Sequence, residues 1–311
     1  MTPVLSRGHA AHAAAFATVF IWGITFISTK ILLTDFQPVE ILFFRFVMAY
    51  SVLWLCYPKW LHWAGWKTEG LFVAAGFTGI CLYYLLENIA LTYTMASNVG
   101  VICCVSPFFT AMLAALCIKG ERALRLKFFV GFIAAISGIA LISFNGAALE
   151  LNPVGDTLAI LASAVWACYS VITKTISRLG YPVLATTRRT FFYGLLWMLP
   201  ALYLFDFRLG LDRFADIGYG IHILFLGLGA SALCFVTWNH AVTVLGAVKT
   251  SVYIYLVPVI TIAVSAVVLD EPVTFLTVIG TALTLLGLAL SEGNIGHTAH
   301  EKIERMHAES E

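Results

Sequence analysis

The two halves of this 311-residue chain repeat their rarer residues at nearly constant spacings. Four pairs lie 144 positions apart (166 − 22): Trp22 and Trp166, Lys30 and Lys174, Pro38 and Pro182, and Arg45 and Arg189. Three more lie 151 positions apart (239 − 88): Asn88 and Asn239, Ala96 and Ala247, and Pro107 and Pro258. Chemically distinct residues that share one offset indicate an internal duplication, so we predict two copies of one folding unit.

The composition excludes a water-soluble fold for these two units. Hydrophobic residues make up 60% of the chain, charged residues make up only 11%, and the mean hydropathy is +0.92. So few charges cannot cover the surface of a soluble domain of this size. Apolar runs of about 20 residues, long enough to cross a bilayer as a helix, are therefore interpreted as membrane spans. Ten such runs are predicted: 12–33, 38–57, 70–92, 98–118, 125–145, 155–178, 183–205, 218–241, 246–269 and 273–291.

An odd number of spans in each copy means that the second copy enters the membrane from the opposite face. The predicted fold class is therefore all-α integral membrane, with ten transmembrane helices in two inverted five-helix repeats around a central cavity. Lysine and arginine gather in the loops on the side of the N-terminus, which predicts that both termini are cytoplasmic. The predicted divisions are a cytoplasmic N-terminal segment (1–11), the first repeat (12–145), a linker (146–154), the second repeat (155–291) and a polar cytoplasmic tail (292–311).

Glu87 is the main candidate for chemistry, because it is an acidic residue with apolar residues on both sides in the third span. A carboxylate in hydrocarbon costs several kcal/mol unless it is paired, protonated or facing water. Tyr83 and Tyr84 share its helix face, and aromatic rings beside an acid suit an amphipathic or cationic solute. We interpret Glu87 as a site for a proton or a substrate amine. The alternative is a structural partner for a buried basic residue such as Arg45.

Two tryptophans, Trp22 and Trp166, sit near the middle of their spans, away from the interfacial zone where tryptophan is usual. Each belongs to a polar stripe that lipid would not favour, so both stripes are expected to face the interior of the bundle. The stripes are Thr18, Trp22, Thr25 and Thr29 in the first span, and Ser163, Trp166, Tyr169, Ser170 and Thr173 in the sixth. We interpret the stripes as walls of a cavity. The alternative is that their Ser and Thr side chains form hydrogen bonds between helices.

The paired amides Asn88 and Asn239 are candidates either for substrate binding or for holding the two halves in register. Trp238, which precedes Asn239, and Tyr253 are further candidates for the substrate site.

Among the basic residues of the spans, Arg45 is the one placed deepest. It lies seven residues beyond Pro38 (45 − 38), and we expect it to pair with Glu87 or to meet a substrate carboxylate. The others are closer to predicted boundaries and are expected to reach the headgroups: Lys30, Lys174, Arg188 and Arg189.

Pro107 and Pro258 fall near the middle of the fourth and ninth spans. Proline removes a backbone hydrogen bond and kinks a helix, so matched kinks serve as flexing gates or as fixed bends that shape the cavity. Small-residue faces in the fifth and tenth spans predict close helix packing, within one protomer or between two. They comprise Gly131, Ala135 and Gly138, and Gly280, Thr284 and Gly287.

Several of these features together resemble the EamA family of the drug/metabolite transporter superfamily. They are Trp22 and Lys30, Arg45, the segment from Glu87 to Asn98, Pro107, and the turn at Gly120 and Glu121. The resemblance covers essentially residues 12–291. It implies a ten-helix basket with a central cavity, and export of amino acids or other small metabolites. It does not imply a role for Glu87.

A duplicated membrane fold supplies two conformations of similar energy around one pathway, which favours a transporter. We expect a secondary carrier of the inner (cytoplasmic) membrane that exports amino acids or related metabolites by alternating access, with protons as the candidate coupling ion. The alternatives are an uncoupled facilitator or channel, and a membrane scaffold without transport. The sequence shows no motif for a nucleophile, metal, cofactor or nucleic acid, so no enzyme is expected. The expected partners are the solute, protons and the bilayer, in a monomer or homodimer.

Overall fold

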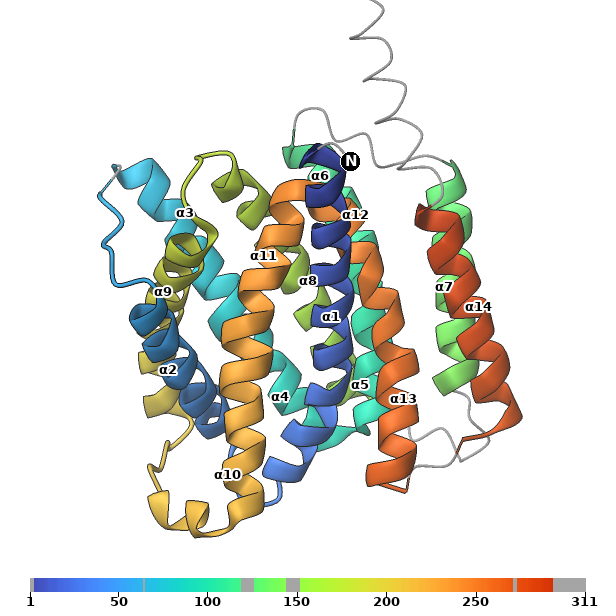
Figure 1. Cartoon of the computed structure of the whole chain (residues 1–311). Coiled ribbons are helices and arrows are strands. Elements are labelled where there is room, and N and C mark those ends of the chain that lie inside the picture. The colour runs from blue at the N-terminus through green and yellow to red at the C-terminus, as the bar shows by residue number, and fades with distance from the viewer. Residues whose placement is uncertain (1–2, 64, 119–125, 144–151, 271–272, 293–311) are drawn as a thin grey trace, which may run out of the picture.

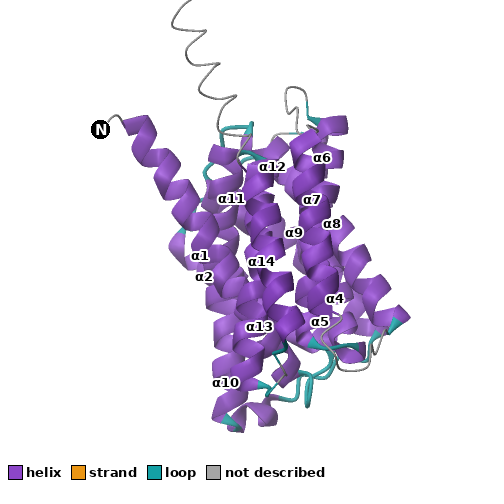
Figure 2. Ribbon diagram, turned by 90° about the vertical axis from the view of Figure 1, so that its right-hand side faces the viewer, coloured by secondary structure: helices purple, strands orange, loops and turns teal. Residues whose placement is uncertain are grey.

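The computed structural model describes residues 3–63, 65–118, 126–143, 152–270 and 273–292. In these ranges all regular structure is helical and there is no strand (Figure 2). In the first half the elements are α1 (Pro3–Leu32), α2 (Pro38–Cys56), α3 (Trp66–Gly76), the π-helix η1 (Phe77–Leu82), α4 (Tyr83–Tyr93), α5 (Ala96–Ile102), the 3₁₀ helix η2 (Cys103–Val105), α6 (Ser106–Cys117) and α7 (Leu126–Ser143). In the second half they are α8 (Pro153–Ser177), α9 (Val183–Leu204), the 3₁₀ helix η3 (Leu211–Ala215), α10 (Ile217–Leu224), the π-helix η4 (Phe225–Leu233), α11 (Cys234–Leu245), α12 (Ala247–Ser251), the 3₁₀ helix η5 (Val252–Leu256), α13 (Val257–Val268) and α14 (Phe275–Glu292).

The chain is a multi-pass membrane protein. Within the described ranges, seven helices are long and apolar enough to cross a bilayer: Gly8–Leu32, Pro38–Cys56, Trp66–Tyr93, Ala96–Cys117, Pro153–Ser177, Ile217–Leu245 and Ala247–Val268. The remaining predicted spans coincide with α7, α9 and α14. Residues 3–11, predicted as a separate N-terminal segment, are the first turns of α1. The predicted tail from residue 293 onward and residues 146–151 of the predicted linker lie outside the described residues.

Helix boundaries recur between the two halves with the offsets of the sequence repeat. The helices α4, α5 and α6 begin at residues 83, 96 and 106, and α11, α12 and α13 begin 151 positions later, at 234, 247 and 257. The π-helices η1 and η4 end 151 positions apart (233 − 82), and α7 and α14 are 149 apart at both ends (275 − 126 and 292 − 143). Equivalent sequences therefore form equivalent local structure, irregular turns included.

The two matched prolines stand at a change of helix type. Pro107 and Pro258 lie in the first turn of α6 and of α13, directly after the 3₁₀ helices η2 and η5. A proline ring clashes with the carbonyl one turn earlier and has no N–H to donate, which disfavours a continuous α-helix. The preceding turn therefore tightens to 3₁₀ geometry, and the predicted kinks take this form.

The helices α7 and α14 pack against each other at one side of the bundle (Figure 1). A Cβ atom added to Gly138 would lie 2.4 Å from the carbonyl oxygen of Gly280, and one added to Gly287 would lie 2.5 Å from the backbone nitrogen of Ala135. Only glycine permits backbones to approach this closely. The small-residue faces predicted from the sequence therefore meet each other within one chain.

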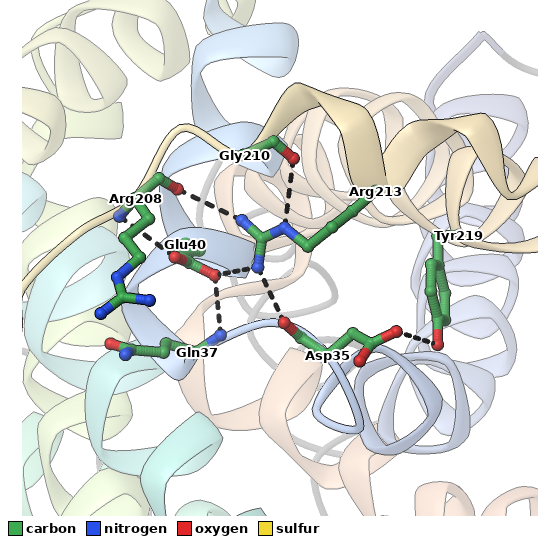
Figure 3. A network of polar contacts seen from close by, with 7 residues as sticks. All are labelled: Asp35, Gln37, Glu40, Arg208, Gly210, Arg213 and Tyr219. Atoms are coloured by element: carbon green, nitrogen blue, oxygen red, sulfur yellow. Dashed lines mark hydrogen bonds and ion pairs between the residues drawn. The ribbon is translucent and has the colours of Figure 1, made fainter.

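Glu40, buried in the first turn of α2, holds the loop that follows α9 (Figure 3). Its carboxylate accepts hydrogen bonds from the backbone N–H groups of Gln37 (2.9 Å) and Arg208 (3.1 Å). It also pairs with the guanidinium of Arg213 at 2.7 Å, and that guanidinium donates to the carbonyl oxygen of Asp35 at 2.7 Å. A carboxylate at a helix N-terminus also complements the helix dipole. One acidic residue thus fixes both the start of α2 and the long connection to α10.

Arg213→Met is expected to destabilise the protein, because it leaves the Glu40 carboxylate buried without its countercharge. The free energy of unfolding should fall by roughly 2–3 kcal/mol, less than for a fully buried pair, since the Arg213 side chain is 19% exposed. Thermal unfolding in detergent measures the change. Arg208→Met is the matched control, because Arg208 enters this network through its backbone N–H and C=O. An equal loss in both variants would contradict the role of the ion pair.

Candidate functional site

A narrow cavity of about 30 Å³ lies inside the bundle where helices of both halves meet; we call it the central cavity. Its walls come from α1, α4, η2 and α6 of the first half and from α8, η5 and α13 of the second. The lining residues are Trp22, Thr25, Phe26, Tyr83, Tyr84, Glu87, Cys103, Ser106, Trp166, Ile254 and Val257. The structure therefore brings together five residues predicted from the sequence to bind substrate: Trp22, Tyr83, Tyr84, Glu87 and Trp166.

The repeat-related tryptophans form one wall of the central cavity. The rings of Trp22 and Trp166 meet edge to face, with centroids 5.2 Å apart, and Tyr83 packs 4.9 Å from Trp166. The indole N–H of Trp22 donates to the carbonyl oxygen of Ala230, in the π-helix η4, at 3.0 Å. The indole nitrogen of Trp166 is buried and has no hydrogen-bond partner. This wall offers aromatic surface together with one uncommitted donor.

Glu87 is the one acidic side chain among the lining residues of the central cavity. It is only 2% exposed and lies one helical turn after Tyr83 in α4. Its Oε2 atom is buried and has no partner. A buried carboxyl oxygen without a donor is costly, so this atom is suited to hold a proton or to accept a hydrogen bond from a bound cation.

Arg45 stands behind the central cavity rather than in its lining. The side chain is 1% exposed, its Nε donates to the Ser231 hydroxyl at 2.9 Å, and its guanidinium carbon lies 4.3 Å from the Tyr84 ring centroid. Both terminal nitrogens, Nη1 and Nη2, are buried without a partner. In the described part of the chain no ion pair joins Arg45 to Glu87, so the predicted direct pairing is not formed here.

The two matched asparagines lie outside the lining of the central cavity, and each ties together helices of its own half. The Asn88 amide in α4 donates to the carbonyl oxygen of Pro38, at the start of α2, at 3.1 Å. The Asn239 amide in α11 donates to the hydroxyl of Thr187 in α9 at 2.9 Å, and its oxygen accepts from Tyr169 of α8 at 2.9 Å. These contacts fix helices within one half and do not join one half to the other.

Four further predicted residues also lie outside the lining of the central cavity: Tyr169, Ser170, Trp238 and Tyr253. The Ser170 hydroxyl donates to the carbonyl oxygen of Trp166, one turn earlier in its own helix. Trp238 is fully buried behind Trp22, with ring centroids 4.9 Å apart. The Tyr253 hydroxyl is hydrogen-bonded to Nδ1 of His12 at 2.5 Å. The next residue in η5, Ile254, lines the central cavity instead.

The polar stripes of α1 and α8 face the interior of the bundle, as predicted. All their Thr, Ser, Tyr and Trp166 side chains are buried. Thr25 of the first stripe lines the central cavity, whereas five other lining residues were missed: Phe26, Cys103, Ser106, Ile254 and Val257. Ser106, next to Pro107, was the one with a sequence signal, because a polar residue beside a mid-span proline marks irregular backbone. The four apolar or thiol residues have no such signal.

The two matched lysines bind backbone carbonyls at helix C-termini. Lys30 Nζ donates to the carbonyl oxygens of Leu91 (2.6 Å) and Thr94 (3.0 Å) at the end of α4. Lys174 Nζ donates to two carbonyl oxygens at the end of α11 in the same way. Helix C-termini carry unpaired carbonyls and partial negative charge, so an ammonium group stabilises them. The expectation that these lysines reach the headgroups gives way to this capping role.

The two arginines of α9, of which Arg189 is the repeat partner of Arg45, also serve the structure. Arg188 donates to the carbonyl oxygens of Tyr57 and Lys59. Arg189 pairs with Glu69 at 2.5 Å. Both therefore pin the connection between α2 and α3 to the bundle rather than reaching outward.

Comparisons with known proteins agree with this architecture. Residues 9–144 and 153–292 each match the EamA-like transporter family. An uncharacterized transporter of Archaeoglobus fulgidus is 28% identical over 90% of this chain and 96% of that protein. A probable amino-acid metabolite efflux pump of Escherichia coli is 25% identical over 89% and 93%, and a probable terminal-alkyne amino-acid exporter of Streptantibioticus cattleyicolor is 28% identical over 69% and 70%. A solved crystal structure shares the fold, with a TM-score of 0.69 over 90% of this chain and 97% of that chain at 18% identity.

Arg45→Met is expected to raise the midpoint of thermal unfolding by a few degrees, because it removes a buried charge with two unpartnered nitrogens and keeps a similar volume. Ser231→Ala should lower the midpoint, since it takes away the hydrogen-bond partner and leaves the charge. Differential scanning fluorimetry in one detergent measures both. A fall for Arg45→Met as large as that for Ser231→Ala would contradict this account.

Proposed function

The chain belongs to the EamA-like transporter family, and from this membership we propose that it is a secondary transporter that exports amino acids or related small metabolites across the cytoplasmic membrane by alternating access. Two similar proteins are named as a probable terminal-alkyne amino-acid exporter and a probable amino-acid metabolite efflux pump. The observation that carries the proposal is the central cavity, which lies between the halves and combines aromatic walls with the buried carboxyl group of Glu87.

Ten membrane crossings in two inverted repeats are part of the same proposal. The matched helix boundaries support it, because α7, α9 and α14 then complete five spans in each half. The repeats would comprise residues 12–145 and 155–291, joined by the linker 146–154. The helix α1 begins and α14 ends at the same end of the bundle (Figure 1). Together with the lysine and arginine distribution, this supports a cytoplasmic location for both the segment 1–11 and the tail 292–311.

In this mechanism the solute binds in the central cavity, with its apolar part against Trp22 and Trp166 and its amine at Glu87. Binding of a proton to Glu87 competes with binding of the amine, because both need the same carboxyl oxygens. Such competition couples proton entry to solute exit. Arg45, behind Tyr84, is the countercharge for the Glu87 carboxylate in this scheme, since opposite charges attract strongly in a low-dielectric interior.

The turns before Pro107 and Pro258 are the candidate hinges of the cycle. In both halves a 3₁₀ turn precedes the proline, and η2 and η5 each contribute a residue to the lining of the central cavity. A 3₁₀ turn has weaker hydrogen bonds than an α-helix, so its geometry changes at low cost. Matched weak points on either side of one cavity suit a fold that alternates between two openings.

Glu87→Gln tests the proton role, because glutamine keeps the shape and cannot exchange a proton. The solute for the assay is the amino acid that gives the largest thermal shift. In proteoliposomes, we expect the stimulation of transport by an imposed pH gradient to be lost, because a glutamine side chain does not titrate and cannot couple proton entry to solute exit. Counterflow of the solute without a pH gradient should persist.

Asp156→Asn is the matched control, because Asp156 lies in the first turn of α8 and outside the lining of the central cavity. It should leave the pH dependence unchanged. Unaltered pH dependence in Glu87→Gln would remove the proton role and leave the transporter role standing. Absence of trans-stimulation in the parent protein would instead indicate an uncoupled channel.

A further inference from the structure

A second, smaller cavity, of about 20 Å³, lies among α8, α9 and α11; we call it the hydroxyl pocket. Its lining residues are Thr173, Ile176, Ser177, Tyr181, Val183, Thr186, Thr190, Asn239 and Thr243. Six of these nine carry a hydroxyl group and none carries a charge. The connection from α8 to α9, which contributes Tyr181, lies at the end of the bundle where α1 begins (Figure 1). Polar surface in this position lies on a route from that end of the bundle toward its interior.

Three of the six hydroxyl groups in the hydroxyl pocket are left as hydrogen-bond acceptors. The hydroxyls of Ser177, Thr186 and Thr243 donate their hydrogens to backbone carbonyls of their own helices at 2.8, 2.9 and 2.8 Å. A hydroxyl that has donated its hydrogen still has lone pairs to accept one. The matching ligand chemistry is therefore an N–H donor, as in an ammonium or amide group.

A short chain of hydrogen bonds separates the hydroxyl pocket from the central cavity. The Tyr169 hydroxyl donates to Oδ1 of Asn239 at 2.9 Å, and the Asn239 amide donates to the Thr187 hydroxyl at 2.9 Å. Asn239 lines the hydroxyl pocket, and the Tyr169 ring packs 5.0 Å from Trp166, which lines the central cavity. Tyr169 and Thr187 are buried and line neither cavity. Side chains of α8, α11 and α9 thus close the space between the two cavities.

The same wall also includes the first half of the chain. A Cβ atom on Gly79 of η1 would lie 2.2 Å from the Tyr169 ring, so this ring packs on bare backbone. Each hydrogen bond of the wall joins neutral groups, and such a bond contributes less than one to a charged group. A movement of the π-helix η1 relative to α8 would therefore release Tyr169 at modest cost.

Building on the proposed transport function, we propose that the hydroxyl pocket is a second solute site, which takes the ammonium or amide end of the solute, and that Tyr169, Asn239 and Thr187 form the gate between it and the central cavity. When the gate opens, the amine leaves neutral hydroxyl acceptors and reaches the carboxyl group of Glu87. Tyr169 and Asn239 are in this view gating residues rather than part of the central solute site.

Native Cys103 reports on the gate, because it lines the central cavity. In a chain whose other cysteines are replaced by alanine, a membrane-impermeant trimethylammonium methanethiosulfonate is applied from each face of sealed vesicles. The second reporter is Ser177→Cys in a background without Cys103. Its reaction with the reagent measures access to the hydroxyl pocket and identifies the face from which the pocket opens. Tyr169→Phe keeps the ring and removes the gate bond; Asn239→Leu removes both bonds.

The reagent is added from the face at which the Ser177→Cys thiol reacts. In each gate variant, we then expect Cys103 to react on the order of tenfold faster than in the parent. A tenfold change corresponds to the loss of a bond worth about 1.4 kcal/mol. The rate at the Ser177→Cys thiol should be the same with the gate intact or broken. Ethylammonium chloride should protect that thiol, and sodium acetate, the matched anion, should not.

Unchanged reactivity of Cys103 in both gate variants would overturn the gate. A Ser177→Cys thiol that reacts from neither face, or that acetate protects as well as ethylammonium, would overturn the second site. Labelling requires no turnover, so these outcomes are independent of the transport assay. If both thiols react as expected but the protein transports no solute, the proposed transport function is contradicted and the proposed gate is not.

Discussion

Hydrocarbon cannot hydrogen-bond, and every other feature of this protein follows from that constraint. Backbone groups must find partners inside the chain, which is why the described structure is helical and why its irregular turns lie within the bundle. The π-helix η4 illustrates the rule, because the carbonyl oxygen of Ala230 accepts the indole N–H of Trp22. The same contact ties a wall of the central cavity to the irregular backbone behind it. Departures from α geometry therefore occur where neighbouring side chains can satisfy the backbone.

The constraint also sorts the charged side chains into two kinds. Some in the described ranges are satisfied: Glu40 pairs with Arg213, and Lys30 caps the end of α4. Glu87 and Arg45 are different, since both are buried and both retain atoms without partners. Unsatisfied buried charge is costly, and proteins accept that cost chiefly at functional sites. This contrast is the physical reason for placing the proposed chemistry at Glu87, with Arg45 as its electrostatic neighbour.

The two halves share local structure and differ in what their side chains do. Asn88 and Asn239 occupy matched positions, yet Asn88 binds a backbone carbonyl at the start of α2, whereas Asn239 joins the side chains of Tyr169 and Thr187. A carrier needs similar halves to reach two conformations of similar energy. It needs different side chains to treat the solute differently at its two openings. Matched positions therefore share backbone structure and differ in the contacts of their side chains.

The sequence by itself determined the class of fold, the matched helices, the inward-facing polar stripes and the grouping of Trp22, Trp166 and Glu87. These follow from hydropathy, helical period and duplication, which are readable along the chain. Only the tertiary structure decided that Arg45 donates a hydrogen bond to Ser231 behind Tyr84. It also decided that Tyr253 is hydrogen-bonded to His12, whereas Ile254 lines the central cavity. Such contacts join residues up to 241 positions apart and depend on how 3₁₀ and π turns rotate each helix, which no local pattern encodes.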